Sequence, residues 1–136
     1  MNCDVAVVDT YIDCDALLRQ VQDVRAGAVV SFAGVVRNHD HGVAVTGIEY
    51  VGHPSAEQVL REIVAEFEGR VHRIAVQHRV GRLGIGGVAL YLAVAASHRK
   101  EAIACLDELI DQIKARLPIW KKQFLVDGTH EWLQCP

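Results

Sequence analysis

The chain has 136 residues, of which 51% are hydrophobic and 23% charged, and its formal net charge is −3 at pH 7. These values are typical of an ordinary globular domain and do not fit a strongly basic nucleic-acid-binding protein. No apolar run reaches the roughly 18 residues that a membrane span needs. We therefore expect a single domain over residues 1–136, with no nucleic-acid partner and no membrane partner. The N-terminus shows no leader pattern, which predicts a cytoplasmic protein.

An apolar strand, a short helix and a second strand make up the first part of the chain. Residues 3–8 are mostly apolar and predict an edge strand. Asp13 or Asp15 can cap a helix that ends before Gly27. Residues 28–36 are apolar on both faces, which predicts a central strand that is covered on both sides.

Three strands and one helix are expected in the middle of the chain. Residues 43–51 predict a return strand, and Pro54 opens a second helix. Two further strands, at 71–80 and 87–96, flank the glycine-rich loop 81–87. This loop is too short for a crossover helix and matches no phosphate-binding pattern, so we expect a hairpin.

The last part of the chain contains the longest helical pattern. Ser97 is a good N-cap for a helix over 98–117, and Pro118 ends it. The apolar residues expected on one face of this helix are Ile103, Leu106, Ile110, Ile113 and Leu117. A strand over 119–126 follows. The order of elements predicts an α+β fold with a mixed or antiparallel sheet and about three helices.

Cations occupy the first turn of this helix, where the helix dipole favours anions. His98 and Arg99 there, together with free backbone N–H groups, are suited to bind a phosphate. Lys114 lies on the shoulder of the apolar face, where partial burial would favour an acid or base role. Lys121 follows seven residues later, and side-chain alternation allows only one of Lys121 and Lys122 to reach the same site. We expect these groups to converge on one pocket for an anionic substrate.

Other polar residues give weaker signals. Arg37 ends a strand at the lip of a turn, where functional groups are common, although an ordinary surface arginine fits the pattern as well. His39 and His41, with His53 further on, lack the spacing of a metal site, so we expect no metal and no cofactor. The four cysteines are scattered and are expected to be reduced, incidental thiols.

Four segments, in order, resemble the large, catalytic subunit of molybdopterin synthase. They are residues 27–38, 78–83, 97–99 and 114–121, followed by Asp127, Gly128 and Trp132. The resemblance implies an α/β-hammerhead fold and a sulfurtransferase that converts cyclic pyranopterin monophosphate (precursor Z) into molybdopterin, in molybdenum cofactor biosynthesis. It also implies that the sulfur comes from the C-terminal thiocarboxylate of a small ubiquitin-like subunit. The implied assembly is a heterotetramer built on a dimer of large subunits.

Residue roles follow from the matching motifs. The resemblance implies that Lys114 lies against the partner's terminal glycine and that Lys121 is an acid/base group beside the substrate. The residues implied to bind the substrate are Arg37, His98, Arg99, Lys122 and Gln123. Similar proteins often have Glu where this chain has Val51. They usually have Glu where this chain has Gln123. Two alternatives stay open: a lyase that uses Lys114 or Lys121 as a Schiff base, and a non-catalytic paralogue that only binds the small subunit.

Overall fold

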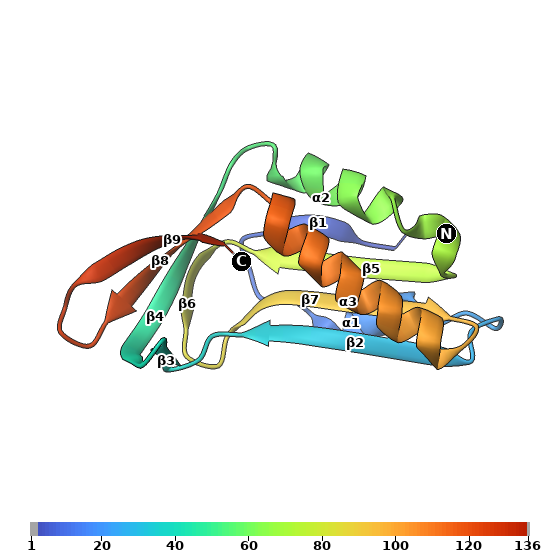
Figure 1. Cartoon of the computed structure of the whole chain (residues 1–136), viewed down its shortest axis with the longest axis horizontal. Helices are drawn as coiled ribbons and strands as arrows, with labels where there is room; N and C mark the ends of the chain where they lie inside the picture. The colour runs from blue at the N-terminus through green and yellow to red at the C-terminus, as the bar shows by residue number, and fades with distance from the viewer. Residues whose placement is uncertain (1–2, 136) are drawn as a thin grey trace.

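The computed structural model describes residues 3–135, which form two β-sheets and three α-helices (Figure 1). This content confirms the predicted α+β class. The first sheet has the strand order β1-β5-β7-β2, in which β1 and β5 are parallel and the other neighbours antiparallel. Its strands are β1 (Val5–Val8), β5 (Arg73–Arg79), β7 (Val88–Ala96) and β2 (Ala28–Val35).

Helices cover both faces of the first sheet. Helix α1 (Cys14–Gln20) packs on one face, against β5 and β7, and buries Leu17 there. Helices α2 (Ala56–Ala65) and α3 (Arg99–Arg116) lie side by side on the other face (Figure 1). The predicted cap of α1 is confirmed for Asp13, whose side chain accepts a hydrogen bond from the Ala16 N–H at 3.0 Å.

The second sheet extends from one end of the first (Figure 1). Its strands are β3 (His39–Asp40), β4 (Val43–Gly52), β8 (Ile119–Leu125) and β9 (His130–Cys135), with β6 (Gly81–Gly84) paired to β4. The predicted strand over 43–51 is therefore present as β4, but after the turn it pairs with β3 and not with β2. Strands β5 and β7 pair antiparallel as predicted, and the glycine-rich segment between them adds strand β6 to the second sheet.

Strand β2 lies at the edge of the first sheet, so the expectation of a central strand over 28–36 is wrong. Its burial alternates along the strand, and Val29 and Val35 are 45% and 51% exposed. The strand covered on both faces is β7, which is buried throughout residues 89–96. Both segments are continuous apolar runs, and such a run does not reveal which other strands pair with it.

Helix α3 buries a face that is rotated from the predicted one. The residues buried on this face are Ala102, Cys105, Leu109 and Ile113, whereas Ile103 is 53% exposed. Two of these buried residues are small, and small side chains let the helix approach the sheet closely. The N-cap is His98 and not Ser97, because the Ser97 hydroxyl is hydrogen-bonded to His72 Nε2 at 2.8 Å. Leu117 is extended before Pro118, as predicted.

Two side chains of α2 bind the free edge of β1. Glu57 accepts a hydrogen bond from the Val7 N–H at 3.0 Å, and Arg61 Nε donates to the Val5 carbonyl at 3.1 Å. Glu57 and Arg61 also form an ion pair of 3.3 Å. Unpaired strand edges recruit other strands, so these contacts protect the edge from association.

Substitution of Gly27 tests the close approach between the start of β2 and the end of β7. A Cβ atom at Gly27 would lie 2.6 Å from the Ser97 carbonyl oxygen, which is backbone and cannot rotate away. We expect Gly27→Ala to lower the free energy of unfolding by about 1–3 kcal/mol in urea denaturation. The matched control is Gly69→Ala, whose Cβ would meet nothing within 4 Å. Equal losses in both variants would contradict this account.

Candidate active site

The register of β8 against β4 separates the two neighbouring lysines. Lys121 lies opposite Tyr50, and Lys122 lies opposite Glu49. Because successive side chains of a strand alternate between its faces, Lys121 shares a face with Gln123, which is only 2% exposed. The core-facing side of β8 therefore carries Lys121 and Gln123, and the other side carries Lys122.

Lys122 contacts aromatic rings on the outer face of the second sheet. Its Nζ lies 5.3 Å from the centroid of Phe124 and 5.6 Å from that of Trp132. Such contacts with a cation stabilise the strand pair modestly. The structure therefore does not bring Lys122 to the side of β8 that carries Lys121 and Gln123, although the resemblance implies one pocket for all three.

Asp40 gathers polar side chains from three segments at the end of β2. Its carboxylate accepts a hydrogen bond from Gln123 Nε2 at 2.9 Å and lies 3.5 Å from Arg37 and 3.3 Å from His41 Nδ1. The hydrogen bond from Gln123 lowers the pKa of Asp40, and the nearby charges of His41, Lys121 and Arg37 lower it further, against the opposite effect of burial. Asp40 is therefore ionised at neutral pH and links three of the predicted site residues.

The Gln123 side chain presents an unused acceptor beside this cluster. Its Oε1 atom is buried and has no hydrogen-bond partner among the residues that the structure describes. Buried polar atoms without a partner are rare in folded proteins. The amide is thus held on one side only, by Asp40, and its carbonyl oxygen has no hydrogen-bond partner among the described residues.

Arg37, at the edge of this cluster, and Lys114, in α3, are both exposed to solvent. The Arg37 side chain is 67% exposed. Lys114 is also exposed, so its expected partial burial is not observed. It lies in the last turn of α3, which ends just before β8 begins (Figure 1). Arg37 and Lys121 thus meet around Asp40, and Lys114 lies at the same end of the molecule.

His98 and Arg99 lie at the opposite end of the first sheet (Figure 1). Helix α3 has 18 residues between the Arg99 end and the Lys114 end, which corresponds to a length of roughly 27 Å. The β2 register agrees, because Ala28 pairs with Ala96 beside His98, whereas Arg37 follows the other end of β2. A single chain therefore does not bring all of these cations together, and their convergence on one pocket stays a prediction.

His78 on β5 is a buried polar residue to which the sequence interpretation gave no role. The side chain is 0% exposed, and its Nδ1–H donates to the Arg79 carbonyl at 2.9 Å. Burial lowers the pKa of His78 to about 4, in spite of this hydrogen bond. The ring packs edge-on against Tyr50, with the ring centroids 5.2 Å apart, and Tyr50 is the β4 residue that pairs with Lys121. Two signals in the sequence pointed to it: a histidine inside an apolar strand, and its place at the start of segment 78–83, which carries part of the family resemblance.

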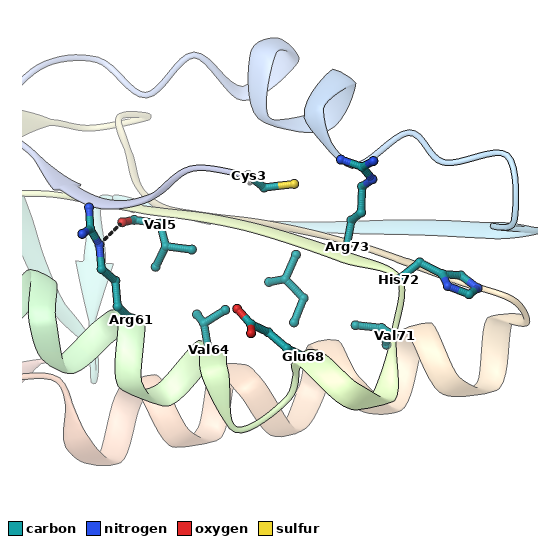
Figure 2. A pocket seen from close by; sticks show the side chains of 9 residues that line it. Cys3, Val5, Arg61, Val64, Glu68, Val71, His72 and Arg73 are labelled. Atoms are coloured by element: carbon teal, nitrogen blue, oxygen red, sulfur yellow. Dashed lines mark hydrogen bonds between the residues drawn. The ribbon is translucent and has the colours of Figure 1, made fainter. Parts of the chain in front are cut away.

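A cavity of about 500 Å³ lies away from this cluster, between α2 and the first sheet (Figure 2). Figure 2 shows Cys3 and Glu68 directed into it, with Arg61 and Arg73 at its rim. Both arginines bind within the chain: Arg61 donates to Val5, and Arg73 Nε donates to Asp23 at 3.1 Å. None of the predicted site residues lines this cavity.

Two features are absent from residues 3–135, the range that the structure describes. No helix in this range is long and apolar enough to cross a membrane. No group of three His, Cys, Asp or Glu side chains there is placed to hold a metal ion.

Comparisons with known proteins give one consistent result. Residues 7–116 match the sequence model of a family described as MoaE protein. The chain is 33% identical to the molybdopterin synthase catalytic subunit of Thermoplasma volcanium, over 97% of this chain and 98% of the relative. A crystal structure of molybdopterin synthase from Staphylococcus aureus superposes with a TM-score of 0.86 at 33% identity, covering 93% of this chain and 94% of that chain.

A more distant solved structure shares the fold. It is a complex of subunits 1 and 2 of the molybdopterin-converting factor from Helicobacter pylori, with a TM-score of 0.77 at 19% identity. The match covers 96% of this chain and 90% of that one. At this identity, the similarity is evidence for the arrangement of strands and helices alone.

The buried His78 ring makes the stability of the fold depend on pH. Between pH 6.5 and about 4, the unfolded chain binds a proton on His78 that the folded chain excludes. The free energy of unfolding should therefore fall as the pH drops through this range. We expect His78→Asn, which keeps an N–H group near the Arg79 carbonyl, to flatten the slope by up to about 1.4 kcal/mol per pH unit. Urea denaturation across this range measures the slope.

The control for this experiment is His130→Asn, at an exposed position of β9. This variant should keep the slope of the unmodified chain. An identical slope in the His78 variant would contradict the assignment of the pH dependence to His78.

Proposed function

The chain belongs to the MoaE protein family, and we propose that it acts as the catalytic subunit of a molybdopterin synthase. In this function it is a sulfurtransferase that acts on precursor Z and takes sulfur from the C-terminal thiocarboxylate of a small ubiquitin-like subunit. The observation that carries the site assignment is the meeting of Arg37, Lys121 and Gln123 around the ionised Asp40. A cationic cluster of this kind suits an anionic substrate and an anionic sulfur donor.

The lysines act on the reacting groups in this proposal. Attack of the thiocarboxylate sulfur on the pterin side chain develops negative charge and requires proton transfer. Lys121 lies on the inner face of β8 beside Asp40, where a fixed ammonium group can stabilise that charge and move the proton. Lys114, exposed in the last turn of α3, is free to bind the carboxyl end of the partner's tail.

Phosphate binding is divided between two ends of the chain. Arg37 lies at the lysine end, whereas His98 and Arg99 lie about one helix length away. One small substrate cannot span roughly 27 Å, so both groups reach it only if a second copy supplies one of them. We therefore propose that a two-fold dimer places His98 and Arg99 of one copy beside Lys121 of the other.

The partner enters this site as an extended chain. Recognition of a C-terminal tail in a cleft lined by cations fits a known mode of peptide binding. The complete assembly is then a heterotetramer, with one small subunit on each copy of a large-subunit dimer. We extend the proposal to the whole chain, residues 1–136, as one domain that acts in the cytoplasm without a resident cofactor or metal.

Loss of Lys121 tests the assignment of the reaction. We expect Lys121→Ala to reduce molybdopterin formation by about 100-fold or more, because a positioned acid/base group contributes that much. The assay mixes the purified chain with thiocarboxylated small subunit and precursor Z. Lys122→Ala should lose much less activity, since Lys122 lies on the other face of β8. The opposite ranking of the two variants would contradict the site, and no product from the unmodified chain would contradict the function.

Mixing two inactive variants tests the shared site. If each site combines residues of two copies, Lys121→Ala and Arg99→Ala chains should complement each other after subunit exchange. Half of the dimers are then mixed, and each of these has one intact site, so activity should return to about a quarter of the unmodified level. If Arg99 and Lys121 act within one chain, every site keeps one defect and no activity returns.

A further inference from the structure

We propose that Asp40 is a positioning residue of this site, whose carboxylate holds Lys121, Arg37 and the Gln123 amide in the arrangement that the reaction needs. This inference rests on the proposed function. It assigns a role to a residue that belongs to none of the sequence motifs for the active site.

The backbone fixes Asp40 at the last position before a tight turn. Strand β3 pairs Asp40 with Val43 of β4, and the two residues between them have positive φ angles, 48° at His41 and 79° at Gly42. This combination is the one required by a two-residue hairpin turn. The Asp40 side chain is only 12% exposed, so its carboxylate has little freedom to turn toward solvent.

The carboxylate lies between cations that come from separate segments. The charged and titratable groups that face it are Arg37 from the β2–β3 connection, His41 from the turn and Lys121 from β8. Without the carboxylate, the like charges of Arg37 and Lys121 would face each other with no anion between them. Asp40 therefore keeps two cations close enough to act on one anionic substrate.

Asp40 also determines which way the Gln123 amide points. An ionised carboxylate only accepts hydrogen bonds, so it selects the NH₂ group of Gln123, at 2.9 Å. The carbonyl oxygen Oε1 must then point away, and it is the buried atom without a partner among the described residues. Neutralising Asp40 would let the amide rotate and would remove this acceptor from the site.

Exchanging the two side chains separates positioning from simple packing. Asp40→Asn keeps the size of the side chain but removes its charge, and we expect kcat for molybdopterin formation to fall by about 10- to 100-fold. The double variant Asp40→Asn/Gln123→Glu restores one carboxylate and one amide in the same contact, and it should recover most of kcat. Asp107→Asn, at an exposed position of α3, is the control for the loss of one negative charge. Thermal unfolding of each variant reports on the fold.

The result that would overturn the proposal is a fall in kcat that the double variant does not recover, or no fall in Asp40→Asn. A second measurement needs no enzyme activity: NMR of the Gln123 side-chain amide and the Lys121 ammonium group in the free chain. Both signals should move in Asp40→Asn. The Lys121 signal should return in the double variant, which carries Glu at position 123 and has no amide signal there. Unchanged signals in Asp40→Asn would overturn the proposal. If the unmodified chain makes no product, the proposed function fails, and the NMR result alone then decides whether Asp40 positions these groups.

Discussion

The antiparallel pairing of β8 with β4 is the constraint on which the site depends. A slip of one residue would exchange the faces of Lys121 and Lys122 and would expose Gln123 in place of a neighbour. The register is held because buried side chains such as Ile48 of β4 and Ile119 of β8 belong to the main core. The chemistry of the inner face thus follows from the packing of apolar residues around it.

The length of the first sheet sets the distance between the two cationic regions. Strand β2 is the edge strand of the first sheet, and helix α3 packs on the face of this sheet against β2 and β7. Each runs from one end of the sheet to the other (Figure 1). One region follows the end of β2 at Arg37, and the other begins α3 at His98. Because a packed layer cannot fold back on itself, contact between the two regions requires a second molecule. Under the proposed function, the fold therefore couples assembly of a dimer to completion of the site.

Buried polar groups gather where the two sheets meet. His78, Tyr50, Gln123 and Asp40 belong to four different strands, and each carries a polar atom that an apolar core would exclude. Burial of such groups lowers stability unless each finds a partner. Asp40 and Gln123 are hydrogen-bonded to each other, and this contact gives the junction a defined polar geometry next to the half-buried Lys121.

Local signals in the sequence determined the α+β class, the Asp13 cap, the end of α3 at Pro118 and the family resemblance, because each depends on residues that are neighbours along the chain. Only the tertiary structure decided that β7 is an inner strand and β2 an edge strand, that Lys121 faces inward and that the cationic regions lie apart. These features depend on pairing between distant segments: Asp40 and Gln123 are 83 positions apart. Hydrophobic periodicity indicates the buried side of a segment only approximately, as the rotated face of α3 shows, and it does not identify the segment that packs against it.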